Sequence, residues 1–530
     1  MRHILLLLLF CCTAAAVSAQ SAGSYPMSAT DRQHMERAIQ DYNKKRYLKS
    51  TDQLHRLSQL YPNNPDIYFY LGLNAVKRDY NTLGIRRYFT KVIQLAPNYP
   101  DAVAHFYMGV IHYTDNQFDQ AVDQFNQYFT MANNHGTPES DALYMEASNY
   151  LYWSQFLAEA YRHIAPYHPH VVTGVSSPDD ELLPFFTHDS SQCFFLRYTS
   201  TPSPTTFHTN ELQTKQLKLF SATRRDSAFA DAHILPAPFN QGDPEGSVSV
   251  TADNRQLFYS VIRRFRGYNN SDIYFSNYDG THWSPIANLG DSVNGSDCWD
   301  SQPSITPDGN TLYFASNRKG GLGGTDIWRC HRKADGSWSR PVNLGSSVNT
   351  PDNEKCPFIH ADGHTLYFAS DGWQGFGGYD LYFIDLDRDT LSKPTNLGLP
   401  FNTEEDDITL GLFPNGSHAY YAGRSDSPNR IGGTDVLTFE LHPAARPEPM
   451  TLLRGHVNAP DGTPLQATLT VKHGSLSVAS YTADTEGFFT ILISLQRPNT
   501  VTVSVPSYQP VTLSSTQLHS SPLIVTLQRQ

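Results

Sequence analysis

Three short motifs recur in the same order along the middle of the chain, and their spacing limits its possible folds more than any other feature. The sequence TLYFAS occurs at residues 311–316 and again at 365–370, a shift of 54. A second motif, an aspartate followed by an apolar residue, recurs at shifts of 54, 54 and 55. Its four aspartates are Asp272, Asp326, Asp380 and Asp435. Apolar and polar residues alternate within each copy and turn residues separate the runs, so each copy predicts several short β-strands.

Repeated sets of four short strands predict a β-propeller, in which radial repetition leaves only short, protected sheet edges. The motifs resemble the WD40-like propeller repeats of bacterial envelope proteins and of TolB-type domains, and the resemblance covers residues 169–442. Five first strands are visible, but the last copy has only three strands. Residues 169–181 echo residues 341–354, so the segment that enters this region is expected to supply the missing strand. We therefore expect five blades; six is the alternative if residues 199–214 contain further strands.

Residues 28–165 have a helical pattern that also repeats. The Pro-Asn pair that follows Leu60 recurs after Leu95, a shift of 35 residues. Gly72 and Gly109 lie 37 residues apart, at positions where two helices are expected to approach closely. The pattern resembles the tetratricopeptide repeat, a helix-turn-helix unit of about 34 residues. The resemblance implies a concave face that binds peptide or protein.

The last part of the chain follows a linker rich in alanine and proline at residues 443–449. Residues 450–530 contain alternating strands and turns such as Asp461-Gly462. This segment resembles the carboxypeptidase-regulatory type of small immunoglobulin-like β-sandwich. The expected fold class is therefore multidomain, α-helical first and all-β afterwards.

The N-terminus predicts export. Residues 1–19 have the polar start, apolar run and small residues of a secretory signal peptide, and the apolar run is too short to span a bilayer. A lipid anchor at Cys11 or Cys12 is an alternative. We expect the protein in the periplasm, at the outer membrane or at the cell surface, joined to a membrane only by such an anchor or by its partners.

The net charge bears on the class of binding partner, and the cysteines bear on disulfide formation. The net charge of −12 argues against nucleic acid, whose binders concentrate lysine and arginine. One or two disulfides are expected among the cysteines beyond residue 19, because exported proteins meet an oxidising compartment. These are Cys193, Cys298, Cys330 and Cys356.

The sequence contains neither a GxSxG nor an HExxH motif. We therefore expect no enzyme, and we assign no catalytic, cofactor-binding or metal-binding residue. The repeated aspartates are interpreted as structural, because an active site is rarely copied into every blade and aspartate commonly binds the backbone of adjacent turns. The glycine run at residues 320–324 is interpreted as a tight turn with positive φ rather than a phosphate cradle.

The sequence thus predicts a non-catalytic scaffold or adaptor that binds envelope or outer-membrane proteins through the helical repeats and a propeller face. The domain order resembles Bacteroidetes-type envelope proteins, including a group of the type IX secretion apparatus, although the OmpA-like C-terminal domain of that group is not found here. One alternative is a carbohydrate-binding protein, with glycan held on the propeller face or the sandwich. A further alternative is a propeller hydrolase or lyase, which would need polar residues that converge at the central channel from non-equivalent blade positions.

Overall fold

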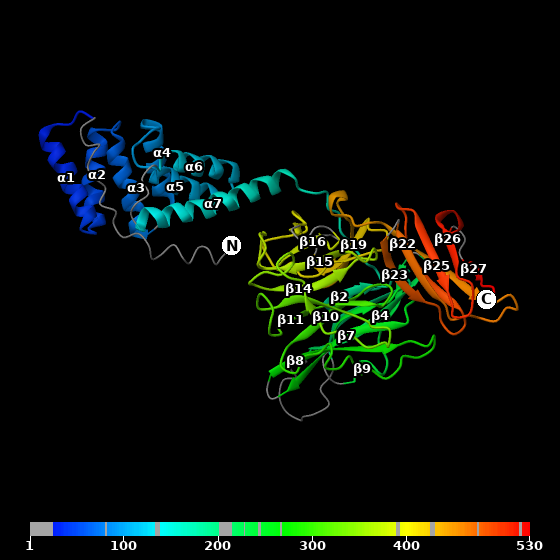
Figure 1. Ribbon diagram of the computed structural model, residues 1–530. Helices are drawn as coiled ribbons and strands as arrows, with labels where there is room; N and C mark the ends of the chain where they lie inside the picture. Colours follow the sequence, from blue (N-terminus) through cyan, green and yellow to red (C-terminus); the bar gives the residue numbers. More distant parts are fainter. Residues whose placement is uncertain are drawn as a thin grey trace, which may run out of the picture. The chain divides into compact units, whose positions relative to one another are not determined.

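The chain divides into two compact units, residues 1–164 and residues 165–530 (Figure 1). The structure is a computed structural model that describes residues 25–79, 82–132, 138–200, 215–226, 228–241, 245–265, 268–387, 393–424, 430–473, 476–518 and 522–530. The predicted signal peptide at residues 1–19 lies outside the described residues. No helix among the described residues is both long and apolar enough to cross a membrane.

The first unit is helical. Its described helices are α1 (Ala29–Asn43), α2 (Tyr47–Leu60), α3 (Pro65–Asp79), α4 (Thr82–Leu95), α5 (Val103–Thr114), α6 (Phe118–Met131) and α7 (Pro138–Arg162). Consecutive helices contact one another along the chain. A Cβ on Gly72 would lie 2.6 Å from the ring of Phe89, and one on Gly109 would lie 2.7 Å from the ring of Phe125. Glycine therefore lets α3 approach α4, and α5 approach α6, as the spacing of the two glycines predicted.

The second unit is all-β apart from single 3-10 turns, and its first part consists of five four-stranded antiparallel sheets among the described residues. In sheet order they are β2 (Glu181–Phe186), β3 (Gln192–Ser200), β4 (Lys215–Arg225) and β5 (Ala228–Ile234); β6 (Glu245–Val250), β7 (Gln256–Phe265), β8 (Tyr268–Asn277) and β9 (Ala287–Asn288); β10 (Asp300–Ile305), β11 (Thr311–Ser316), β12 (Asp326–His331) and β13 (Val342–Asn343); β14 (Glu354–Ile359), β15 (Thr365–Ser370), β16 (Asp380–Asp385) and β17 (Thr395–Asn396); and β18 (Gly411–Leu412), β19 (His418–Gly423), β20 (Asp435–Glu440) and β1 (His170–Val171). The region is propeller-like. Residues 201–214, on which the six-blade alternative depends, lie outside the described residues.

The last sheet is completed by the segment that enters the region. Strand β1 pairs antiparallel with β20, with His170 opposite Thr438 and Val171 opposite Leu437. The pairing joins residues more than 260 positions apart and confirms the prediction that the entering segment supplies the missing strand.

Neighbouring sheets share their apolar cores and hydrogen bonds. Phe258 of β7 and Phe314 of β11 are fully buried in one cluster that two successive sheets contribute to. The Ser249 hydroxyl of β6 accepts the backbone N–H of Ile305 in β10 at 3.0 Å. One repeat later, the Ser304 hydroxyl accepts the N–H of Ile359 in β14 at 2.9 Å. The inner strands are thereby fixed side by side.

The C-terminal part of this unit packs two sheets face to face. One is β24 (Phe488–Ser494), β21 (Met450–Asn458) and β27 (Leu523–Thr526); the other is β23 (Leu476–Thr482), β22 (Thr468–His473), β25 (Asn499–Ser504) and β26 (Val511–Ser514). Alternate residues of β25 are buried, as expected for a sheet with one face on a core. Fully buried side chains from both sheets, including Val457, Leu469 and Ile491, form that core.

The sandwich docks on the turns between the first and second strands of the propeller-like sheets. Asp189 pairs with Arg454 at 2.5 Å, and Arg255 pairs with Asp484 at 2.6 Å. The carboxylate of Asp308 accepts the backbone N–H of Ser480 at 3.1 Å. These turns are Asx-type turns, because Asp308 also accepts the N–H of Asn310 two residues later. Asp308 thus shapes its own turn and also binds the sandwich.

Candidate functional site

Three of the repeated aspartates, Asp326, Asp380 and Asp435, lie at the start of the third strand of their sheets, where they bind the preceding glycine-rich loop, whereas Asp272 lies in the middle of β8. Asp326 accepts the backbone N–H groups of Leu322 and Gly323 at 2.5 and 3.1 Å. Asp380 accepts those of Phe376 and Gly377, and Asp435 accepts those of Ile431 and Gly432, all at 2.8–3.2 Å. Asp272 accepts instead from the side-chain amide of Asn288 at 3.0 Å. The structure does not bring these four aspartates to one common centre; each serves its own sheet.

Asp380 differs from its counterparts in a way that the repeat did not reveal. The Asn343 amide adds a third hydrogen bond to Asp326, but the equivalent Asn396 donates to the carbonyl of Gln374 instead. One oxygen of Asp380 is left without a hydrogen-bond partner in the described structure. Burial, followed by the nearby charge of Asp407, raises the pKa of Asp380 to about 7. In the sequence this difference is marked by Gln374, which stands where the preceding repeat has Gly320.

The glycine-rich loops owe their glycines mainly to close packing, and the predicted positive φ accounts for one of them in residues 320–324. Within residues 320–324 only Gly320 has positive φ, at +92°. A Cβ on Gly323 would lie 2.2 Å from the carbonyl oxygen of Asp352, and one on Gly377 would lie 2.2 Å from that of Glu405. Each loop therefore lies against the backbone that leads into the next sheet, and it continues into a strand rather than a helix.

The inner strands of the five sheets, with the segment before β18, surround a central channel that encloses about 60 Å³. The residues around it are Leu183, Pro184, Phe185, Ser247, Val248, Ser249, Gln302, Pro303, Ser304, Cys356, Pro357, Phe358, Thr409, Leu410, Gly411, Tyr420 and Tyr421. Bulges in the inner strands shape this channel: the pairing register shifts between Ser301 and Ser304 and between Lys355 and Phe358. Left-handed backbone at Gln302 (φ +56°) and Cys356 (φ +47°) accompanies these bulges. Such conformations cost free energy and persist only where surrounding structure holds them.

The channel lining is uncharged among the described residues. Aromatic rings and prolines alternate with the hydroxyls of Ser247, Ser304 and Thr409 and with the amide of Gln302. Burial raises the pKa of the Cys356 thiol to about 12, so that this group is also neutral. The Ser247 hydroxyl makes no hydrogen bond in the described structure. The sequence analysis assigned none of these residues to a binding site, because they come from different strands.

The four described cysteines are unpaired, which corrects the expected disulfides. Cys193 and Cys330 are fully buried on strands, where neither faces another cysteine. Burial raises the pKa of Cys298 to about 11 and that of Cys330 to about 12, so both are thiols rather than thiolates at neutral pH.

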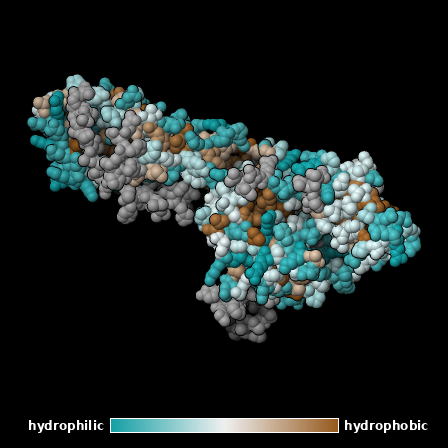
Figure 2. Space-filling model, viewed as in Figure 1, coloured by the Kyte–Doolittle hydropathy of each residue, from teal (hydrophilic) through white to brown (hydrophobic). Residues whose placement is uncertain are grey.

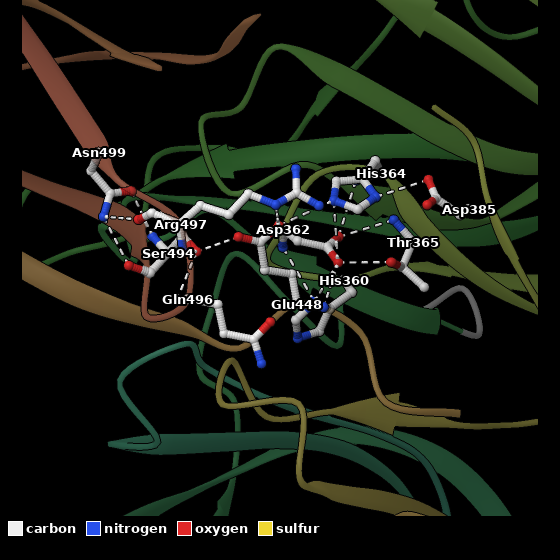
Figure 3. Close-up of polar contacts among 10 residues, drawn as sticks. All are labelled: His360, Asp362, His364, Thr365, Asp385, Glu448, Ser494, Gln496, Arg497 and Asn499. Atoms are coloured by element: carbon white, nitrogen blue, oxygen red, sulfur yellow. Dashed lines mark hydrogen bonds and ion pairs between the residues drawn. The ribbon is translucent and has the colours of Figure 1, made fainter. Parts of the chain in front are cut away.

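A second concentration of polar groups lies where the sandwich meets the propeller-like sheets (Figure 3). We call His360, Asp362, His364, Glu448 and Arg497 the junction cluster. Asp362 accepts the backbone N–H of Glu448 at 3.2 Å and lies 3.3 Å from the His360 ring. Glu448 lies 3.1 Å from Arg497. His360 and Asp362 are almost fully buried, so these groups are shielded from water.

The junction cluster has unusual proton affinities. Burial lowers the pKa of His364, but the carboxylates of Asp362, Asp385 and Asp387 outweigh it and the net pKa is raised. Burial raises the pKa of Asp362, but the charge and hydrogen bond of His360 and the charge of His364 hold it well below its usual range. No described group of three or more His, Cys, Asp or Glu side chains is placed to hold a metal ion.

These shifts predict how stability depends on pH. A raised His364 pKa stabilises the fold below the ordinary histidine pKa, and that contribution is lost as pH rises through the raised value. The lowered Asp362 pKa acts oppositely: its contribution is present above the ordinary aspartate pKa and is lost at strongly acidic pH. We expect the midpoint of urea denaturation to fall as pH rises from the ordinary histidine pKa of about 6.5 through the raised value of His364, and His364→Gln to lessen that fall. An equal slope in the variant would contradict the assignment.

Comparison with known proteins finds no matching family model and no matching curated protein. Among solved structures, the chain spans 43% of the length of a puromycin-hydrolysing peptidase of Mycobacterium tuberculosis, over 55% of its own length, with 13% identity and a TM-score of 0.30. A glycosyl hydrolase from Bacteroides ovatus matches 52% of this chain and 94% of its own, at 12% identity and a TM-score of 0.32. The Bombyx mori GH32 β-fructofuranosidase matches 71% and 92%, at 11% identity and a TM-score of 0.34.

The expectation that this chain is not an enzyme is wrong on that comparison. The matched structures are glycoside hydrolases and a peptidase. The absence of short catalytic motifs was a poor guide, because groups that meet in a propeller channel come from strands about 54 residues apart.

Proposed function

We propose that this chain binds a neutral saccharide in the central channel of its propeller-like region. The observation that carries the proposal is the chemistry of the channel lining, which combines aromatic rings with hydroxyl and amide groups and has no charged side chain among the described residues. A sugar ring has apolar C–H faces and neutral hydroxyls, and such groups suit this lining.

Two features of the channel favour a neutral ligand over an ion. A charged group taken from water into an uncharged pocket loses its hydration without gaining an opposite charge, which is costly. The cost is smaller for a sugar hydroxyl, because Ser247, Thr409 and Gln302 can replace the hydrogen bonds that it made with water. The ring of Phe358, partly exposed and 6.3 Å from that of Tyr420, offers an apolar surface for the sugar face.

The size of the channel limits the ligand. Its volume of about 60 Å³ has room for roughly four to six water molecules. A single sugar residue or the end of a glycan chain fits this space better than a continuous polysaccharide.

We further propose that the protein acts in the cell envelope, with the helical unit as a protein-binding part. Export is supported by residues 1–19. Apolar side chains are exposed on α7, including Met145 and Tyr152, which are 62% and 55% exposed and share one helix face through their spacing of seven. Hydrophobic residues are also visible toward the α6–α7 end of this unit in Figure 2. A role in type IX secretion stays a prediction from the sequence.

Binding measurements on two channel variants test the proposal. Ser247→Ala removes an unpaired hydroxyl, so it should leave the thermal midpoint unchanged while weakening saccharide binding about three- to tenfold. Phe358→Ala should weaken it about tenfold or more through the lost stacking surface. The measurement is isothermal titration of the full chain with a panel of neutral and charged mono- and disaccharides, with release of reducing ends recorded in parallel.

The matched control is Phe383→Ala, which removes a partly exposed ring of the same region that does not line the channel. Its saccharide affinity should equal that of the unmodified chain. Affinity that is unchanged in both channel variants, or a consistent preference for charged sugars, would contradict the proposal.

A further inference from the structure

Gln302 is distinct among the residues that the five inner strands place at one equivalent position of the channel. That position is the third residue of β2, β6, β10 and β14, and of the segment from Asp407 that leads into β18; it holds Leu183, Ser247, Gln302, Cys356 and Thr409. Only Gln302 has an amide, and it is also the only one with a side chain both long and polar. A single amide in a repeated setting is the kind of difference that recognition of a ligand requires.

The side chain of Gln302 is held in place by the neighbouring strand. Its Oε1 accepts the backbone N–H of Cys356 at 2.9 Å. This bond fixes the amide orientation, because only the oxygen can accept from an N–H group. The left-handed backbone of Gln302 and the proline that follows it further restrict the side chain. An oriented donor loses little conformational freedom when it binds a ligand.

The orientation leaves the amide nitrogen as the free end. Nε2 of Gln302 makes no hydrogen bond to any residue that the structure describes. The same channel is also lined by the apolar side chains of Leu183, Pro303 and Pro357. The combination is one fixed donor beside apolar walls, and it complements a group that has an acceptor oxygen next to a methyl.

We propose that the channel selects sugars that carry an acetamido group, with Gln302 Nε2 donating to the acetamido carbonyl and the methyl packing against the prolines. The inference rests on the proposed saccharide binding and names its ligand class. Unmodified sugars lack the carbonyl and the methyl, and an amino sugar brings an ammonium charge that the described channel does not balance.

Three sugars that differ only at carbon 2 test the inference on the unmodified full chain: N-acetylglucosamine, glucose and glucosamine. We expect N-acetylglucosamine to bind at least about tenfold more tightly than either other sugar in isothermal titration, since one well-placed hydrogen bond and a buried methyl together contribute that much. Glucose that binds within threefold of N-acetylglucosamine would overturn the acetamido assignment and leave the proposed function standing. Failure of all three to bind would overturn the acetamido assignment, and failure of the whole saccharide panel would overturn the proposed function as well.

A pair of variants locates the preference at the amide. Gln302→Glu keeps an oxygen for the Cys356 N–H but removes the donor, so the preference for N-acetylglucosamine should disappear and glucosamine should gain affinity from the new negative charge. Gln241→Glu adds the same charge at an exposed glutamine outside the channel and should change nothing. If Gln302→Glu does not fold, Gln302→Met removes the donor without a charge and should also abolish the preference. A preference that persists in the folded variant would overturn the role of Gln302.

Discussion

Replacing Asp362 with alanine is expected to lower the free energy of unfolding of the second unit by about 3–5 kcal/mol, as for other buried ionic groups that lose a partner. Its carboxylate accepts the backbone N–H of Thr365 at 2.9 Å, the hydroxyl of Thr365 at 2.7 Å and the N–H of Glu448 at 3.2 Å. The alanine variant leaves these donors and the His360 ring buried without a partner. Because Glu448 leads into the sandwich, docking of the sandwich should weaken as well.

The measurement is urea denaturation of the full chain, with Asp253→Ala as the matched control. Asp253 occupies the equivalent turn of another sheet, where it is exposed and, among the described residues, accepts only from Thr251 and Arg255. Replacing it with alanine should lower the free energy of unfolding by about 1 kcal/mol. Equal small losses in the two variants would show that the junction cluster does not hold the sandwich in place.

Gly377→Ala is expected to lower the free energy of unfolding by about 3 kcal/mol or more, at the upper end of the effects of overpacking. The added methyl would lie 2.2 Å from the carbonyl oxygen of Glu405 and 2.5 Å from that of Thr403, and backbone cannot move aside as a flexible side chain can. The loop would have to shift, and the hydrogen bonds from Phe376 and Gly377 to Asp380 would weaken with it.

Gly398→Ala is the control for this second prediction. Gly398 has φ of +73° and open space around its Cα, so alanine there meets only the cost of left-handed backbone, about 1–2 kcal/mol. Thermal or urea unfolding of the two variants compares them directly. A loss in Gly377→Ala no larger than in Gly398→Ala would contradict the account of the glycine-rich loops.

The sequence was sufficient for features that local pattern determines. Alternation and turn residues in copies 54 residues apart predicted short antiparallel strands, and the echo between residues 169–181 and 341–354 predicted the pairing of β1 with β20. Gly72 and Gly109 predicted close helix packing because glycine is the residue that permits it. In each case the spacing along the chain carries the structural information.

Features that depend on contacts between distant segments were missed. The channel lining draws Ser247, Gln302 and Phe358 from three strands, and no short motif marks them. The distinct environment of Asp380 arises because Asn396 bonds to Gln374, a choice that the repeated motif does not reveal. The cysteines were expected to pair from the compartment alone, but all four are unpaired. The channel lining, the environment of Asp380 and the state of the cysteines all depend on which segments lie close together in space, and residue type alone does not reveal this.

The location of a bound sugar tests the central claim most directly. Crystals of the full chain soaked with N-acetylglucosamine and with glucose would show where each sugar lies in difference density. The account predicts density in the central channel, against Phe358 and within hydrogen-bonding distance of Ser247 and Gln302. Density on the sandwich or the helical unit, with the channel empty of sugar, would contradict it.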